Sequence, residues 1–412
     1  QKTPNPLVGK QAKSAADIIE SPLLGTANHI QLKRLHPNII ATSSGTSGKP
    51  IEDLSKESEV STLYGDYTNA IKSAYKIARH FNSTITCPAL FWLQGEWNYQ
   101  GYGSGLTSGS KSTFDKNEYK ALQVTLKNNM QNDVKAVYGQ TTTPVFITYQ
   151  CGSQYTKGKE LTIGMAQLEA SNEYDDIVCT GPVYPMTDVG GHLDANGYRW
   201  YGEMLGKVYY KTQILGENFK PLQPLELSRD NADPKKVIIK FLVPKLPLVL
   251  DDKTLGKITD YGFEVYNNTA RQTISNVSIS GDCVILTCAQ NLTGKIEVVY
   301  AGVNAAYVST SGNGRGSGNL RDSDDYPAIF TYQDLDKKDE NGNYVYPRNA
   351  NDASATLRPA FEPKDTTGNV IYDKPYPLYN FSVSFYYAIP DGEQKYTVPN
   401  LTSNQTLISN CG

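Results

Sequence analysis

The alternation of short apolar runs with amphipathic segments in the first half of the chain is the feature that most constrains its fold. Apolar spacing of three and four residues places one buried stripe on a helix, whereas an unbroken apolar run is typical of a strand covered on both faces. The strand-like runs lie at residues 38–42, 89–93, 145–149 and 177–179, and the helix-like stretches at 63–78, 119–134, 160–171 and 198–208.

This alternation predicts an α/β three-layer sandwich of flavodoxin-like type over residues 1–212, with a mostly parallel sheet and helices on both faces. Ligands of such sheets bind at the carboxyl ends of the strands. We therefore expect the functional site in the loops that follow the strands, at 43–50, 94–101, after Tyr149 and at 182–192.

The second half has a different pattern. Short β-branched runs separated by turn signals predict an antiparallel β-sandwich over residues 213–305. Residues 306–412 are rich in Gly, Asn, Asp and Ser and are expected to form a loop-rich β extension and a tail. Within that extension, the run 379–387 is a late strand that could return to the sandwich.

Composition excludes several classes of function. The net charge of the 412 residues is −3, which gives no basic surface for nucleic acid. No apolar run reaches the about 18 residues that a membrane-spanning helix needs. The six cysteines include no CxxC pair, so no zinc site, other metal or cofactor is predicted. A Cys283–Cys288 disulfide is compatible with the spacing but not required by it.

His192 is the strongest candidate for a general base among the four histidines. It follows a Gly-Gly turn after Asp188 and shortly precedes a helix, so that a carboxylate could orient the imidazole. Asp194 is a second candidate for that carboxylate, although its position favours capping of the helix. The alternative reading of His192 is a solvated loop histidine.

The segment 91–98 ends a buried strand in a polar cluster. Gln94 could direct its amide at a developing oxyanion, Gly95 permits a sharp turn, and Glu96 could hold the loops by hydrogen bonds. The alternative is a capped strand end without chemistry.

The segment 43–51 also follows a predicted strand. Its glycines, Gly45 and Gly48, expose backbone N–H groups that suit an oxyanion or anion cradle. A plain polar turn is the alternative.

Taken in order, SGKPI (47–51), WLQGEWN (92–98) and DVGGHLDANGYRWYGE (188–203) resemble the second, third and last motif blocks of the SGNH hydrolase superfamily, in its sialate and xylan O-acetylesterase branch. The resemblance covers about residues 20–210. It implies a Ser-His-Asp mechanism with His192 as base and Asp188 as its partner. It also implies Gly48 (or Gly45) and Gln94 as oxyanion donors, with Gly95, Glu96 and Asn98 in supporting positions.

The chain departs from the family pattern at two points. The family's nucleophilic serine precedes the second block, and residues 1–37 contain no matching strand, so we expect the serine upstream of residue 1. Ser44 or Ser47 as a replacement nucleophile and a catalytically inactive relative are the alternatives. Three residues separate Asp188 from His192, where the family usually has two.

The sequence therefore predicts a carbohydrate O-acetylesterase acting on an acetylated polysaccharide or sialic-acid-like glycan. An inactive glycan-binding or structural protein on the same fold is the second hypothesis, and a glycosidase using Glu96 and Asp188 is the third. A looser C-terminal resemblance to appended β-domains of gut-bacterial and phage tail proteins implies a secreted, periplasmic or virion-tail protein. It also suggests a homotrimer and, as a further partner, an N-terminal fragment carrying the nucleophile.

Overall fold

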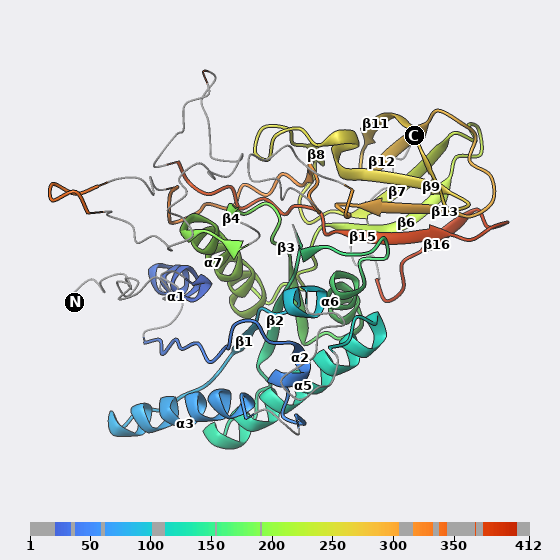
Figure 1. Ribbon diagram of the computed structural model, residues 1–412. Coiled ribbons are helices and arrows are strands. Elements are labelled where there is room, and N and C mark those ends of the chain that lie inside the picture. The colour runs from blue at the N-terminus through green and yellow to red at the C-terminus, as the bar shows by residue number, and fades with distance from the viewer. Residues whose placement is uncertain are drawn as a thin grey trace.

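The computed structural model describes residues 21–33, 38–58, 62–100, 112–152, 155–189, 192–304, 316–332, 338–343, 367 and 374–401 (Figure 1). The first half contains the helices α1 (Pro22–Leu32), α2 (Ile51–Leu54), α3 (Tyr64–His80), α4 (Glu96–Gln100), α5 (Lys116–Tyr138), α6 (Thr162–Glu173) and α7 (Ala195–Tyr209). Its strands are β1 (Ala89–Trp92), β2 (Val145–Gln150), β3 (Ile177–Pro182), β4 (Asp188–Val189) and β5 (His192–Leu193).

Three of these strands form a parallel sheet in the order β1-β2-β3. Leu90 lies opposite Phe146, which in turn lies opposite Ile177. Every residue of β2 and β3 is buried, as expected for apolar runs covered on both faces. Together with the helices and the separate antiparallel sheets, this arrangement is a mixed α/β fold, as the sequence predicted.

Helices contact both faces of the sheet. On one face, Gln123 of α5 lies 3.4 Å from the Thr148 hydroxyl of β2. On the other face, the ring of Tyr201 in α7 packs against Tyr149 of β2, with centroids 5.8 Å apart. Neighbouring residues of a strand point to opposite faces, so these two contacts place α5 and α7 on opposite sides of β2.

The strand expected at 38–42 is not formed. These residues are extended but pair with no strand among the described residues, and Ile39 and Ile40 are 36% and 45% exposed. An apolar run becomes a strand only where a neighbour satisfies its backbone groups, and the described residues supply none here. This part of the sequence prediction was wrong.

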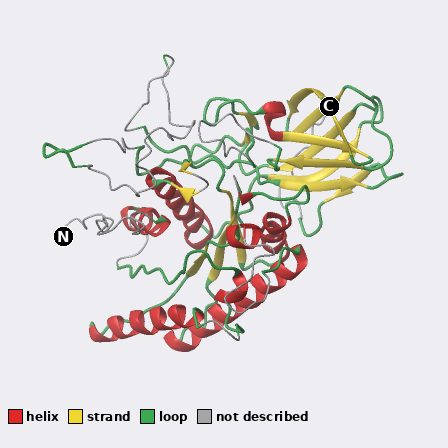
Figure 2. Cartoon of the chain, viewed as in Figure 1, coloured by secondary structure: helices red, strands yellow, loops and turns green. Residues whose placement is uncertain are grey.

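The antiparallel region occupies the upper right of Figure 2. Its strands are β6 (Gln223–Arg229), β7 (Lys236–Leu242), β8 (Val249–Leu250), β9 (Phe263–Asn267), β10 (Ala270–Gln272), β11 (Ile274–Ser280), β12 (Cys283–Cys288), β13 (Ile296–Tyr300), β14 (Leu320–Arg321), β15 (Phe385–Ile389) and β16 (Lys395–Thr397). A π-helical turn, η2 (Tyr210–Ile214), extends α7, and a 3-10 turn, η3 (Thr259–Gly262), precedes β9.

Two sheets, β10-β9-β13-β15 and β11-β12-β7-β6-β16, share one apolar core. The last strand of each sheet in this order, β15 and β16, comes from the region beyond residue 305 and pairs with β13 and β6. The expected late strand thus does return to the antiparallel region, although it spans 385–389 and shares only residues 385–387 with the expected run 379–387.

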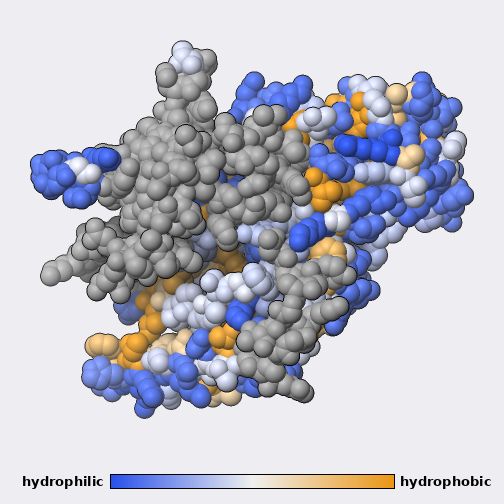
Figure 3. Space-filling view, viewed as in Figure 1, coloured by the Kyte–Doolittle hydropathy of each residue, from blue (hydrophilic) through white to orange (hydrophobic). Residues whose placement is uncertain are grey.

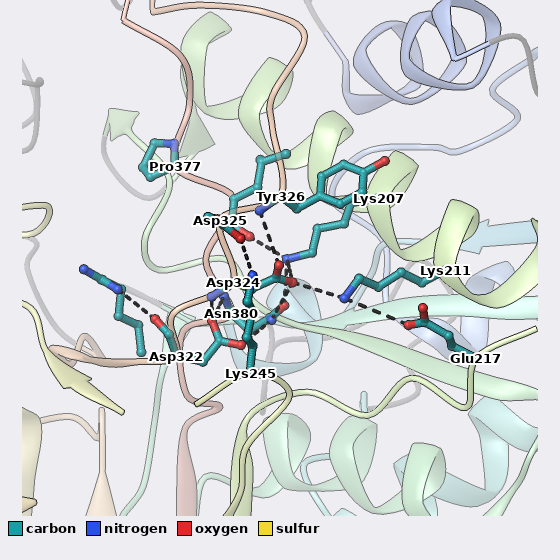
Figure 4. A network of polar contacts seen from close by, with 12 residues as sticks. Lys207, Lys211, Glu217, Lys245, Asp322, Asp324, Asp325, Tyr326, Pro377 and Asn380 are labelled. Carbon is teal, nitrogen blue, oxygen red and sulfur yellow. Dashed lines mark hydrogen bonds and ion pairs between the residues drawn. The ribbon is translucent and has the colours of Figure 1, made fainter. Parts of the chain in front are cut away.

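A buried polar network joins the two halves of the molecule (Figure 4). The ammonium group of Lys207 on α7 is fully buried and lies 2.9 Å from the Asp324 carboxylate. It also donates to the Leu378 carbonyl at 2.5 Å and to the Asn380 amide oxygen at 3.1 Å. Burial lowers the pKa of Lys207, and the neighbouring Asp324 opposes that shift.

Cys283 is disulfide-bonded, whereas Cys288 is a free thiol. The Cys283–Cys288 disulfide considered from the spacing is therefore not formed. One physical reason is that both residues belong to the single strand β12, five positions apart, where the extended backbone holds their side chains well beyond bonding distance.

Candidate functional site

The two segments that resemble the second and third motif blocks lie against each other at the carboxyl end of β1. The Gln94 amide donates to the Lys49 carbonyl at 3.2 Å, and the backbone N–H of Ile51 donates to the Asn98 side-chain oxygen at 3.1 Å. These bonds span more than forty residues of chain, so the juxtaposition is a product of the tertiary fold.

Asn98 is the centre of this junction and is fully buried. Its oxygen accepts from Ile51 and from the Gln94 amide at 2.7 Å, and its amide donates to Glu52 at 3.1 Å and to the Thr113 carbonyl at 3.2 Å. A buried amide with four partners fixes the loops around it. Asn98 therefore has the supporting position that the resemblance implies.

Gln94 is buried beside Asn98 and has a complete set of partners. Its amide nitrogen donates to Lys49 and Asn98, and its side-chain oxygen accepts from the Tyr119 hydroxyl at 2.8 Å. Both amide hydrogens are thus engaged within the protein. To serve an oxyanion, Gln94 would have to release the longer of these bonds, the one to Lys49.

Gly95 occupies a position that no other residue fits without displacement. Its φ is +151°, and a Cβ there would lie 2.7 Å from the Gln167 amide nitrogen and 3.0 Å from the Cys151 sulfur. The sharp turn expected at this glycine is present, and it lets Gln167 reach the Gln94 carbonyl at 2.7 Å.

Glu96 is held by a short hydrogen bond from the Tyr149 hydroxyl at the end of β2. Burial raises the pKa of the Glu96 carboxyl, and the Tyr149 bond partly offsets this rise. Glu96 also raises the pKa of Tyr198 on the first turns of α7, after the burial of that phenol itself. The carboxyl therefore links the loop after β1 to β2 and faces α7, which fits the loop-holding role expected for it.

Gly48 is exposed, with a φ of +67°, and the indole of Trp97 lies beside it. Ser47 is exposed and Ser44 half-buried. Ser44 and Gly45 line a cavity of about 450 Å³ between the 40–45 segment and α3, opposite Asp66, Asn69 and Ser73. No residue of the 47–52 or 94–98 segments lines this cavity, and neither does Asp188, so the cavity does not contain the key side chains of the motif blocks.

The last block forms the hairpin β4–β5, in which Asp188 pairs with Leu193 and Val189 pairs with His192. The Asp188 side chain is buried, and the backbone of His192 is described whereas its side chain lies outside the described part of the molecule. Asp194 accepts from Gly197 N–H at 2.7 Å and from the Thr187 hydroxyl at 2.6 Å. It therefore caps α7, as expected from its position.

One buried histidine, His29, was not singled out from the sequence. His29 of α1 is fully buried, with Nδ1 3.0 Å from Glu203 of α7 and Nε2 3.1 Å from the Tyr326 hydroxyl. Glu203 also accepts from the backbone N–H groups of Ile329 and Phe330. Glu203 and Tyr326 are 174 and 297 residues away from His29 in the chain, so no local pattern could have indicated these contacts.

Within the described ranges, no group of three or more His, Cys, Asp or Glu side chains is placed to hold a metal ion. The same residues contain no helix long and apolar enough to cross a membrane.

No family model matches the sequence, and no curated protein matches it either. Among solved structures, the chain is similar to a carbohydrate acetylesterase from Xanthomonas citri, with 16% identity and a TM-score of 0.50. The match covers 72% of this chain and 61% of that enzyme, so the chain spans less than two thirds of its length. A bacterial S-layer protein, SbsC, matches with 17% identity over 45% of this chain and 24% of its own, at a TM-score of only 0.17.

The likeness to the acetylesterase shows a shared fold. It supports the esterase-like architecture that the motif blocks implied.

Proposed function

We propose that this chain is the larger part of a carbohydrate O-acetylesterase of the SGNH type, on a three-layer α/β sandwich. The observation that carries the proposal is the junction of the 47–52 and 94–98 segments, held by Asn98 and Gln94 at the carboxyl end of β1. Two segments that resemble an oxyanion site in sequence meet in space on an acetylesterase-like fold.

In the proposed mechanism, His192 removes the proton from a serine as that serine attacks the acetyl carbonyl, and Asp188 orients the imidazole. The Gly48 N–H and the Gln94 amide stabilise the tetrahedral oxyanion. The His192 imidazolium then gives this proton to the departing sugar oxygen, which leaves as a hydroxyl, and water releases the acetate from the serine in a second, equivalent cycle.

We place the nucleophilic serine on a strand upstream of residue 1, beside β1. Two features support this position. No described strand pairs with the outer edge of β1, and the apolar residues 39–41 pair with no described strand. Ser44, which lines the cavity, and Ser47 are the alternative nucleophiles within this chain.

The test is acetate release by the full natural protein from acetylated xylan and from ethyl acetate. We expect His192→Ala and Asp188→Asn each to reduce kcat by about a thousandfold or more while the circular dichroism spectrum stays unchanged. Loss of activity on removal of the segment before residue 1, with His192 intact, would locate the serine there. Full activity of the His192→Ala protein would refute the mechanism.

One observation favours a second function, an inactive glycan-binding or structural protein. Both amide hydrogens of Gln94 are engaged by Lys49 and Asn98, which leaves no free side-chain donor at that position. Glycan binding by the full protein without any acetate release would support this reading.

The Cys283 disulfide supports an extracellular setting, because disulfides persist in oxidising compartments. We therefore retain a secreted, periplasmic or virion-tail location as part of the proposal. An acetylated glycan as the substrate and a homotrimer as the assembly are separate parts of it.

A further inference from the structure

The loop after β1 is anchored in the protein interior almost throughout. Gln94, Gly95, Asn98 and Tyr99 are buried, and the Tyr99 hydroxyl accepts from Gly164 N–H at 3.0 Å. Trp97 is the exception, because 37% of its surface is exposed. A large apolar side chain on a segment fixed this firmly has no evident role in holding the segment itself.

Trp97 stands next to the proposed oxyanion site. A Cβ placed on Gly48 would lie 3.8 Å from Cζ3 and 3.9 Å from Cε3 of the indole, so the six-membered ring borders the exposed Gly48 backbone. Polar groups surround this border, since Ser47 is exposed and the Lys49 ammonium lies 3.5 Å from the Asp53 carboxylate.

An exposed indole flanked by hydroxyl and charged groups is complementary to the surface of a pyranose ring. The ring has an apolar C–H face that can cover an aromatic surface, and its edges carry hydroxyls that need hydrogen-bond partners. The anchored backbone on either side of Trp97 also limits the conformational entropy lost on binding.

We propose that Trp97 is a stacking platform for a sugar ring and determines specificity by presenting the acetylated hydroxyl of that ring to Gly48. This inference rests on the proposed esterase function, which it extends to the recognition of the pyranose that carries the acetyl group.

The experiment compares the full natural protein with its Trp97→Ala and Trp97→Phe variants. Binding to acetylated xylo-oligosaccharides and to O-acetylated sialic acid is measured by calorimetry, with His192→Ala as the common background to prevent turnover. We expect Trp97→Ala to weaken binding of the recognised sugar by about tenfold and Trp97→Phe by less, because stacking scales with aromatic surface. Phe81→Ala is the matched control, since Phe81 is a more exposed aromatic, at 70%, at the end of α3.

Kinetics separate this inference from the esterase proposal. With His192 intact, Trp97→Ala should raise KM for the acetylated glycan about tenfold and change kcat/KM for ethyl acetate by a much smaller factor, because ethyl acetate has no ring to stack. If acetate release is absent but Trp97→Ala still weakens glycan binding, the platform stands and the esterase fails. If acetate is released and the variant binds and turns over glycan normally, the platform is refuted. It is refuted equally if the natural protein binds neither sugar.

Discussion

The two edges of the small parallel sheet differ sharply in how they are covered. All six residues of the edge strand β3 are buried, whereas Leu90 is the single buried residue of the four in the opposite edge strand, β1. Hydrophobic surface gathers at the lower left of Figure 3, towards α3 and the extended segment before α2. The exposed apolar residues in these elements and next to them are Ile39, Ile40, Ile77 and Phe81.

The chain's own second half accounts for the covered edge. The Phe381 carbonyl lies beside Gly181 of β3, and the hydroxyl of Tyr184, just after β3, donates to the Ser382 carbonyl at 2.7 Å. At the end of the central strand β2, Gln150 bonds both backbone groups of Ser384. An uncovered strand edge invites pairing with another strand. The antiparallel region thus completes one side of the α/β unit. We propose the missing strand at the outer edge of β1, with which no described strand pairs.

The largest effect is expected from removing the buried ion pair that joins the antiparallel region to α7. Lys207→Ala should lower the free energy of unfolding by about 3–5 kcal/mol, because it removes the fully buried cation and leaves the buried Asp324 carboxylate with the partly exposed Lys211 alone. The measurement is the urea midpoint followed by tryptophan fluorescence.

The matched control for this change is Lys245→Ala. Lys245 pairs with Asp325 on the surface, where both side chains are at least half exposed, so its loss should cost less than about 1 kcal/mol. Equal effects of the two substitutions would contradict a special role for the buried pair.

Acid should weaken the same ion pair, between Asp324 and Lys207. Burial alone would raise the pKa of Asp324, but the charges and hydrogen bonds of Lys207 and Lys211 overcome burial and lower that pKa to about 2. A depressed pKa stabilises the folded state fully above the unfolded value near 3.8, and this stability is lost as the pH falls towards 2. The stability difference between the natural chain and Asp324→Asn should therefore shrink by roughly 2 kcal/mol between pH 7 and pH 2.

Urea unfolding at several pH values measures this difference. Burial raises the pKa of Asp322, which acts in the opposite direction, but Asp322 is present in both proteins. A difference that stays constant with pH would show that Asp324 is not held in its charged form by the lysines.

A smaller effect is expected from Tyr184→Phe. The change removes the donor to the Ser382 carbonyl and leaves that buried carbonyl with one partner fewer, at a cost of about 1 kcal/mol. Thermal denaturation should show the loss, and hydrogen exchange should show faster opening of β3 but not of β1. Faster exchange confined to β1 would reverse our assignment of the covered edge.

The smallest effect concerns the open side. Ile40→Ser should change stability by less than about 0.5 kcal/mol, since the side chain is already 45% exposed. In the unaltered chain, the β1 amides should exchange faster than those of β3. Adding the natural upstream segment should slow hydrogen exchange of the β1 amides and increase the loss of stability caused by Ile40→Ser. No change in either quantity would argue against a strand at this edge.

Much of the fold could be predicted from local pattern because its elements satisfy their own local requirements. The apolar stripe of α5 begins after Asp115, which caps the helix, and ends at Gly139 in a left-handed conformation. The run at 38–42 has the same local pattern as β1 but forms no strand, because pairing depends on a neighbour that the pattern does not contain.

The candidate site divides in the same way. The sequence by itself determined the motif segments, the turn at Gly95 and the cap at Asp194, since each follows from residue type and short spacing. Only the tertiary structure decided that Asn98 ties Ile51 to Gln94, that Trp97 borders Gly48 and that His29 meets Glu203. Such contacts join residues tens to hundreds of positions apart, and they depend on how packed elements meet rather than on any property of the local chain.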